Sequence, residues 1–321
     1  MLHRLTLPTP FAVGDVNCWL LEDEPLTLFD CGPSSGAALD ALERALAALG
    51  HRVEELERLV ITHQHLDHLG LAGILARRSG AEVCALRAAA PVVEDFQASA
   101  DADDALAERL MVRHGVLPDV AKALRAVSRA YRGYGGSARV DRPLDDGETL
   151  PFAGRALRVL RRPGHSPSDT VFHDERSGEL IGGDHLLAQI SSNPLIARPL
   201  PGDDGDGERT RSLLAYLASL RKTRELELSV VLPGHGDPVD DHVALIDERL
   251  RGHERRARRI ARLLAGEPRT AHEIARGLWG DVALTQTYLT LSEVLGHLDV
   301  LVERGEAVEH DDAGVSRFAV S

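Results

Sequence analysis

The sequence predicts an α/β fold with a mainly helical insertion and a C-terminal segment of different character. Short apolar runs that end in Gly, Pro, Asp or His alternate with helical segments up to about residue 90, and short strands return from 140 onward. Residues 91–135 interrupt this alternation with helical periodicity. Residues 246–321 begin with a long arginine-rich helix. We therefore expect one large domain over 1–245, which includes the insertion at about 91–135, and a linker helix with a second domain over 246–321.

Composition limits the classes of partner. The chain has 321 residues, of which 43% are hydrophobic, so it can bury a substantial core. Its formal net charge of −13 argues against a general affinity for nucleic acid, which depends on clustered basic charge. The three cysteines lie far apart in apolar surroundings, as buried thiols do in a reducing compartment, and no apolar run approaches the roughly 18 residues of a membrane span. These features predict a soluble cytoplasmic protein with no membrane partner.

Turn residues and apolar periodicity place the expected elements of the large domain. Strands are expected over 12–21 and 26–29, a helix over 37–49, and strands over 59–61 and 82–86. In the second half, strands are expected over 148–151, 156–160, 170–173, 179–181 and 230–232. Within the insertion, Pro118 starts a helix that carries an apolar stripe, and the segment ends in a glycine-rich hinge at 133–136. Such an insertion forms either a lid over a site or a packed decoration, and the sequence leaves both open.

The stretch from Thr62 to His68 carries four possible metal ligands directly after the apolar run 59–61. His63 and His65 can face one ion, whereas Asp67 and His68 follow the turn and can face a second. Placing so many ionisable groups together is costly unless a cation compensates them. The stretch therefore predicts a metal site at the carboxyl end of a buried strand.

Three more candidate ligands follow strands in the second half of the large domain. His165 lies in a Pro-Gly-His-Ser-Pro loop, Asp184 follows two glycines, and His235 lies in a Pro-Gly-His-Gly loop. Each position alone is a weak indication. Together with the first stretch, they supply seven ligands at predicted strand ends.

These four motifs, over roughly residues 1–245, resemble those of the metallo-β-lactamase-fold hydrolases. The resemblance implies an αββα sandwich with a two-metal site along one edge. It further implies that a first zinc is held by His63, His65 and His165, that a second is held by Asp67, His68 and His235, and that Asp184 bridges them. Asp30 matches an acid of this family that supports a ligand from behind. The absence of a cysteine near any ligand motif makes the set similar to that of glyoxalase II and the zinc ribonucleases.

The implied chemistry is hydrolysis by a hydroxide shared between two zinc ions, although such sites also take iron or manganese. Asp67 and Asp184 would hold the water and the metals, so no serine or cysteine nucleophile is needed. His185, next to the bridging ligand, is a further candidate for contact with substrate. The polar loop formed by Gln189, Ser191, Ser192 and Asn193 either lines the same cleft or is an ordinary hydrogen-bonded loop. Ser168-Asp169 departs from the Gly-His pair that is common in the family.

Residues 246–321 predict a helix over about 242–264, a helix that begins with the capping box Thr270 to Glu273, another helix from about 285, and a hairpin over 306–320. This order resembles the winged-helix domain of the β-lactamase-like 2 hydrolases, some of which are endoribonucleases. From 266 to 321 the chain has ten acidic and four basic residues, so specific binding to duplex DNA is not expected. A structural role beside the cleft, or in a homodimer contact, is expected instead.

The substrate class remains open at this point. Our first hypothesis is a small ester, thioester or lactone, which the acidic charge and a possible apolar lid favour. The alternative is single-stranded RNA, which the domain pairing favours and which the arginines at 249–262 could contact through the RNA backbone. A third hypothesis, a DNA-binding regulator with a vestigial metal site, fits poorly with a complete ligand set.

Overall fold

Two sheets form the centre of the molecule. A computed structural model describes residues 1–203 and 208–321. The first sheet has the order β1-β2-β3-β4-β5-β6 and the second has the order β11-β10-β9-β8-β7. Their strands are β1 Leu2–Leu7, β2 Val16–Leu21, β3 Thr27–Phe29, β4 Arg58–Val60, β5 Glu82–Leu86, β6 Arg142–Leu144, β7 Thr149–Pro151, β8 Ala156–Arg161, β9 Thr170–Asp174, β10 Glu179–Gly183 and β11 Val230–Pro233. Both sheets are mixed, because β3 to β6 run parallel and β11 pairs parallel to β10, whereas the other pairs are antiparallel.

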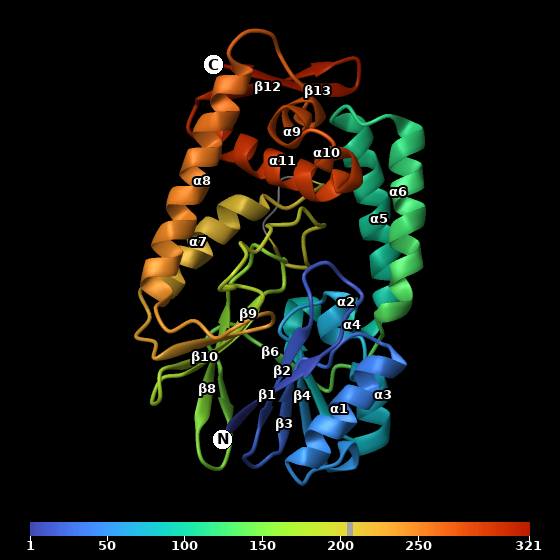
Figure 1. The fold of residues 1–321 in the computed structure, drawn as a ribbon, viewed down its shortest axis with the longest axis vertical. Helices are drawn as coiled ribbons and strands as arrows, with labels where there is room; N and C mark the ends of the chain where they lie inside the picture. Colours follow the sequence, from blue (N-terminus) through green and yellow to red (C-terminus); the bar gives the residue numbers. More distant parts are fainter. Residues whose placement is uncertain (204–207) are drawn as a thin grey trace.

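Three apolar layers hold these sheets between helices. One layer packs the first sheet against α1 (Gly36–Ala48), α2 (Leu66–Leu69) and α3 (Ala72–Ser79). A second layer lies between the two sheets, where Phe29 contacts Phe172 with ring centroids 5.2 Å apart. A third packs the second sheet against α7 (Ser212–Arg224) and α8 (His242–Leu264). Because both faces of β2 are covered, all six of its residues are buried. The αββα architecture expected from the sequence is therefore present (Figure 1).

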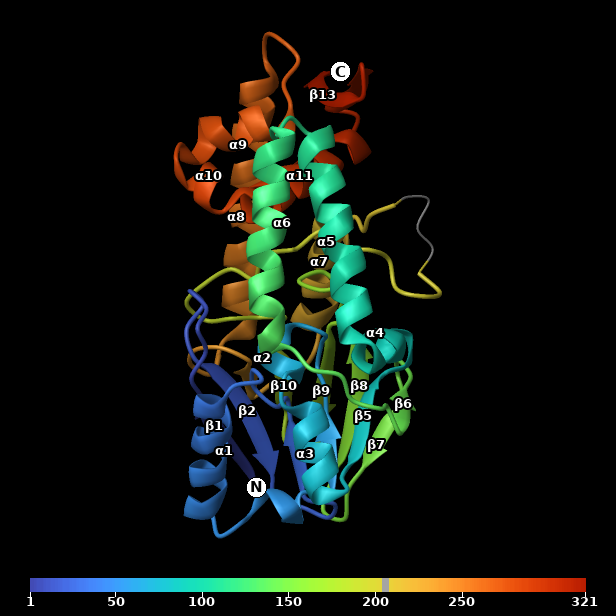
Figure 2. The same cartoon turned by 90° about the vertical axis from the view of Figure 1, so that its right-hand side faces the viewer.

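The helical insertion and the C-terminal segment share one core. The insertion consists of α4 (Ala90–Glu94), α5 (Phe96–Arg113) and α6 (Pro118–Tyr131), and the C-terminal segment of α9 (Ala271–Trp279), α10 (Val282–Thr285), α11 (Thr287–Glu303), β12 (Ala307–Asp312) and β13 (Val315–Val320). Leu106 and Leu110 of α5 pack with Ile260 of α8 and Leu298 of α11. Both views show the α5–α6 hairpin rising from the sandwich to the C-terminal helices (Figures 1 and 2). The insertion is thus anchored at its far end.

Most expected elements are present, and the differences have local causes. The strand expected from residue 12 begins at Val16, because Phe11 to Gly14 form a turn closed by a 3.1 Å backbone hydrogen bond. Strand β1 was not predicted from the sequence, nor were β6 and α7. After α8, the two expected helices and the hairpin are present as α9, α11 and β12–β13, with the short helix α10, which was not predicted, between α9 and α11. Among the described residues, no helix has the length and apolar character that crossing a membrane requires.

Candidate functional site

All seven predicted ligands lie in three overlapping groups at one edge of the sandwich. Within each group, one ligand atom from every side chain lies within 4.8 Å of the others. The groups are His63 with His65 and His165, His63 with His68 and Asp184, and Asp67 with His68 and His235. Since the first and third groups share no residue and His63, His68 and Asp184 connect them, the arrangement has two centres that adjoin each other.

The three histidines of the first centre lie close to one another. Nδ1 of His65 lies 3.1 Å from Nε2 of His63 and 2.9 Å from Nε2 of His165. Burial lowers the pKa of His65 to about 3 and that of His63 well below its usual value. Neutral imidazoles have free lone pairs, so the nitrogens of His63 and His65 suit a cation at neutral pH, and Nε2 of His165 lies beside them.

Asp184 lies between the two centres. Its carboxylate oxygens are 3.4 Å from Nε2 of His68 and 3.5 Å from Nε2 of both His165 and His235. Burial alone would raise the pKa of Asp184, but the charge of His68 and of His235 holds it well below its usual value. Asp184 is therefore ionised, and its position between the centres fits the bridging role expected from the sequence.

Outer partners fix the orientation of four histidines. Nδ1 of His68 donates to Asp30 at 2.8 Å, and Nδ1 of His63 contacts the Thr62 hydroxyl at 3.0 Å. Nδ1 of His165 donates to the main-chain oxygen of Asn193 at 3.0 Å. Nδ1 of His235 donates to the main-chain oxygen of Asp15 at 2.8 Å. In a neutral imidazole, a proton held on Nδ1 leaves Nε2 as the lone pair, which faces the site in each case. Burial would lower the pKa of His68 and of His235, but Asp184 and its neighbours raise both above the usual value, so a cation would have to displace a proton from Nε2 of these two rings.

The carboxylate of Asp30 accepts three of the hydrogen bonds that hold the ligands from outside the site. Its carboxylate accepts the Thr62 amide at 2.8 Å and the Thr62 hydroxyl at 2.8 Å as well as His68. Its backbone has φ of 57°, which is uncommon for a residue other than glycine. The strand-end acid implied by the resemblance therefore holds both a histidine and the loop that carries His63.

Three buried atoms support a cation at this position. Nε2 of His68, Nε2 of His235 and Oδ1 of Asp184 are buried and have no hydrogen-bond partner among the described residues. Such atoms are costly to leave unpaired, so their convergence fits a metal-binding site. Gly234 allows the close approach, because a Cβ there would lie 2.3 Å from Oδ1 of Asp184.

His185 does not join this site. It is fully buried, its Nε2 lies 2.9 Å from the Thr223 hydroxyl, and its ring packs against Tyr216. The expectation that His185 reaches substrate is therefore not met, because its side chain points to α7. Asn193 and Ser192 do support the site, since Ser192 donates to the main-chain oxygen of Asp184.

Ser168 and Asp169, the departure from the family pattern, form a hydrogen-bonded support behind His165. The Ser168 hydroxyl contacts the Gln64 side chain, and Asp169 accepts the Ser166 amide at 2.9 Å. Burial raises the pKa of Asp169 to about 6. The loop that carries His165 is therefore held by side chains rather than by a Gly-His pair.

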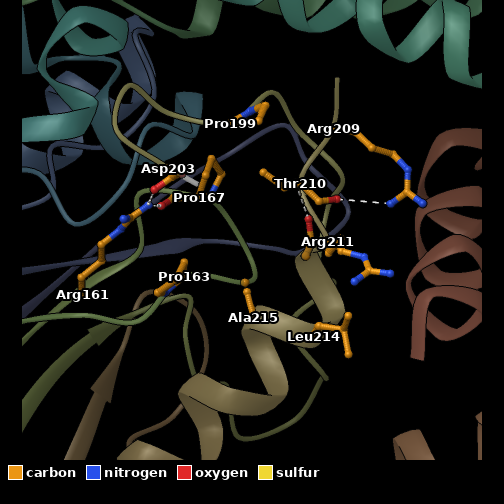
Figure 3. A pocket seen from close by; sticks show the side chains of 12 residues that line it. Arg161, Pro163, Pro167, Pro199, Asp203, Arg209, Thr210, Arg211, Leu214 and Ala215 are labelled. Atoms are coloured by element: carbon orange, nitrogen blue, oxygen red, sulfur yellow. Dashed lines mark hydrogen bonds and ion pairs between the residues drawn. The ribbon is translucent and has the colours of Figure 1, made fainter. Parts of the chain in front are cut away.

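A cavity of about 340 Å³ lies behind the His165 loop and is separate from the ligands. It is lined by Pro163, Gly164 and Pro167 together with residues of 199–203 and 209–215, and by none of the seven ligands (Figure 3). Arg161 at its edge pairs with Asp203 at 2.7 Å, and Arg209 pairs with Asp299. Arg211, the third arginine of the lining, pairs with Glu303 at 2.9 Å, so each of the three arginines described at this cavity is already paired with a carboxylate.

Comparison with known proteins agrees with this geometry. The profile of the metallo-beta-lactamase superfamily matches residues 12–235. A Bacillus subtilis protein named "Probable metallo-hydrolase YqjP" is 35% identical over 304 residues, which cover 95% of this chain and 92% of that protein. A Caenorhabditis elegans protein named "Beta-lactamase-like protein 2 homolog" is 23% identical over 85% of this chain and 74% of its own length. A solved structure of a beta-lactamase domain protein from Burkholderia ambifaria superposes with a TM-score of 0.84 at 28% identity, covering 100% of this chain and 92% of that one. The chain therefore belongs to the metallo-β-lactamase superfamily and is a metallo-hydrolase.

Proposed function

We propose that this protein is a binuclear metal-dependent hydrolase of small esters, thioesters or lactones. The observation that carries the proposal is the convergence of seven His and Asp side chains with three buried, unpartnered ligand atoms at their centre. His63, His65 and His165 would hold a first zinc, Asp67, His68 and His235 a second, and Asp184 both. Iron or manganese could replace zinc on the same ligands. When bound, two such ions would lower the pKa of a bound water so that hydroxide is available at neutral pH, and would polarise the carbonyl group of the substrate.

Side chains of the protein would accept a hydrogen bond from the attacking water and position it. Burial would raise the pKa of Asp67, but His68 and His235 lower it below its usual value, so the carboxylate is ionised at neutral pH. Oδ2 of Asp67 lies 3.4 Å from Nε2 of His235, where it can accept a hydrogen bond from the attacking water and orient it. Asp30 and Thr62 keep the histidines in the tautomer that this requires.

No cysteine competes with this mechanism. Cys18, Cys31 and Cys84 are all buried, and burial raises the pKa of each thiol, that of Cys84 to about 12. A protonated thiol is a poor nucleophile. Water activated at the seven-ligand site is therefore the nucleophile that we propose.

An aromatic group near the cleft favours an apolar acyl substrate. The Phe11 ring lies 5.9 Å from that of Tyr131 and 5.7 Å from that of Tyr134. The loop that carries Phe11 continues to Asp15, whose oxygen accepts from His235, and the oxygen of Tyr134 accepts from the Ser34 amide. We therefore propose that this aromatic group, Phe11 with Tyr131 and Tyr134, forms one wall of the substrate cleft.

Single-stranded RNA is the weaker candidate because arginines near the site are used within the protein. Arg249 of α8 donates to the main-chain oxygens of Leu187, Ala188 and Ile190, and Arg256 pairs with Glu293. Arg132 of the insertion pairs with Asp101 and Asp104. An RNA backbone would require basic groups free to contact phosphates.

We further propose that residues 246–321 form a winged-helix-type module with a structural role. Tyr288 donates to the oxygen of Ile196 at 2.6 Å, and Asn193 donates to the oxygen of Leu289 at 3.4 Å. The oxygen of Asn193 in turn accepts from His165. The start of α11 thus supports the loop that holds a proposed metal ligand, as expected for a module that shapes one side of the cleft.

A substrate comparison with a matched pair of variants tests the proposal. The purified protein should cleave short-chain esters and acyl thioesters faster than single-stranded RNA, and a chelator should abolish the activity. Phe11→Ala should raise KM for apolar acyl substrates several-fold with a smaller change in kcat, because it removes binding surface and no chemistry. Leu117→Ala, at an exposed position at the start of α6, is the control and should leave KM unchanged. Chelator-sensitive RNA cleavage without ester or thioester cleavage would reverse the assignment.

A further inference from the structure

A second cluster of metal-binding side chains lies between α8 and α11 and shares no residue with the site above. It consists of His253 of α8 and of Glu293 and His297 of α11, whose ligand atoms lie within 4.8 Å of one another. Glu293 and His297 are four residues apart, so they lie on the same face of α11. Nδ1 of His253 lies 3.3 Å from Nε2 of His297, and the two rings stack with centroids 5.3 Å apart.

The hydrogen bonds of the cluster leave ligand atoms available. Nδ1 of His297 donates to the main-chain oxygen of Glu293 at 2.7 Å, which leaves Nε2 of His297 as a lone pair directed at His253. Arg256 contacts Oε1 of Glu293, which leaves the second carboxylate oxygen as an available ligand atom. Burial lowers the pKa of His253 to about 4 and also lowers that of His297. Protons therefore do not compete for these nitrogens at neutral pH.

The two histidines of the cluster are buried beside a small cavity. His253 is 8% exposed and His297 is 1% exposed. Nε2 of His253 is buried and has no hydrogen-bond partner among the described residues. Both histidines line a cavity of about 40 Å³ between α7, α8 and α11. That volume exceeds the space that one water needs.

We propose that His253, Glu293 and His297 form a separate structural site for a zinc-class divalent ion, which fastens α8 to α11. Two imidazole nitrogens and one carboxylate oxygen are a ligand set that zinc uses, and the small cavity has room for a water as the fourth ligand. An ion on Nδ1 of His253 would replace the hydrogen bond to Nε2 of His297 and would place that ring's proton on Nε2. Because Glu293 shares its charge with Arg256, this site should bind more weakly than the seven-ligand site.

The contacts around the cluster indicate which helices the ion would hold together. Tyr216 of α7 packs edge-on against the rings of both His253 and His185, and its hydroxyl donates to the oxygen of His185 at 3.0 Å. A Cβ on Gly296 of α11 would lie 2.7 Å from Cβ of Leu213, so α11 and α7 are in close contact here. Fastening α8 to α11 would therefore hold α7 from behind, and α7 supports the loop that carries Asp184. The ion would act on stability rather than on the reaction.

Metal binding to the full-length protein tests this proposal. Metal-stripped protein is titrated with zinc in a metal buffer, and both the metal content and Tm are measured. His253→Phe keeps an aromatic ring against Tyr216 but removes a ligand, and Glu293→Gln keeps the shape but weakens coordination. We expect both variants to bind about one ion per chain less than the wild type, and to lose part of the zinc-dependent rise in Tm, while kcat/KM of the metal-loaded enzyme is retained.

His114→Phe is the matched control. His114 is also a buried histidine next to the C-terminal core, where it stacks on Phe318, but it belongs to none of the candidate metal groups. Its replacement should leave the metal content unchanged. Equal metal content and equal zinc-dependent stabilisation in the wild type and both test variants would show that the three side chains are only a hydrogen-bonded group. If His253→Phe does not fold, as judged by circular dichroism, Glu293→Gln alone decides between these results.

Discussion

Asp30→Asn is the substitution that examines the metal site most directly without removing a ligand. Asp30 accepts from the Thr62 amide, the Thr62 hydroxyl and Nδ1 of His68, each at 2.8 Å. Asparagine tolerates the positive φ of this position, so the backbone is preserved. An asparagine oxygen that keeps the Thr62 amide bond would direct its NH₂ group towards Thr62 and His68. The NH₂ group would favour the tautomer of His68 that has its proton on Nε2, which is the wrong tautomer for binding a cation.

The expected magnitude follows from this loss of orientation. Mutations of outer partners of metal-binding histidines typically cost 10–100-fold in metal affinity or activity, roughly 1.4–2.8 kcal/mol. Competition with a chelator should show a loss of this size for Asp30→Asn, together with a similar fall in turnover at limiting metal. Asp30→Ala should additionally lower Tm, because the buried Thr62 amide loses its acceptor and alanine is strained at this φ. Wild-type metal affinity in Asp30→Asn would refute the argument that Asp30 sets the tautomer of His68.

Three further outcomes are expected. Asp67→Ala should remove the second metal and reduce turnover by orders of magnitude while the fold survives, as elemental analysis, kinetics and circular dichroism would report; unchanged turnover would contradict its role. Asp169→Asn should raise Tm of the metal-stripped protein at pH 7 by more than at pH 4, because burial raises the pKa of Asp169 to about 6 and the folded chain loses stability as that proton leaves between pH 4 and 6. The difference corresponds to about 3 kcal/mol at most, and an equal Tm change at both pH values would argue against it. Labelled duplex DNA titrated with the full-length protein at about 0.15 M salt should show no specific binding, and micromolar or tighter binding would show that the acidic charge of residues 266–321 does not prevent it.

The candidate ligand side chains, and Asp30 behind His68, were predictable from the sequence and its resemblance, whereas the main-chain partners of His165 and His235 were not. His63, His165 and Asp184 follow strands, and strand ends are where an open sheet exposes side chains. The acceptors for His165 and His235 are main-chain oxygens of Asn193 and Asp15. Every residue has a main-chain oxygen, so no residue pattern distinguishes these two before the chain is folded.

The direction of the His185 side chain was also not predictable from the sequence. Its neighbour Asp184 points into the site, and adjacency in the sequence suggested that His185 could also reach it. The chain turns at this point, since Gly183 has φ of 47° and the amide of His185 donates to the oxygen of Gly182. The His185 ring therefore points to Thr223 instead. A turn that follows a strand removes the simple alternation from which side-chain direction is predicted.

Secondary structure was predictable where one face of an element meets water. Helix α8 has an exposed face and an apolar face, and its bounds match the expected 242–264. Helix α7, by contrast, buries small polar residues such as Ser219 and Thr223 as well as leucines, so its pattern has little periodicity. Strand β1 alternates only over Leu5 to Leu7, next to Pro8 and Pro10, and becomes a strand by pairing along the whole of β2. Tertiary contacts decide both elements.

The core that the insertion shares with the C-terminal segment opposes a movement of the whole insertion. Leu106 and Leu110 of α5 are buried with the C-terminal helices, and burying such a side chain contributes about 1.5–3 kcal/mol each. If α5 and α6 swung away as a lid, these leucines would become exposed and the two helices would separate from α11. We therefore expect any opening of the proposed cleft to be local, within the loop that carries Phe11 or the glycine-rich turn after Tyr131. A change in the C-terminal segment would then reach the proposed substrate wall through the packed α5–α6 hairpin, which connects that core to Tyr131.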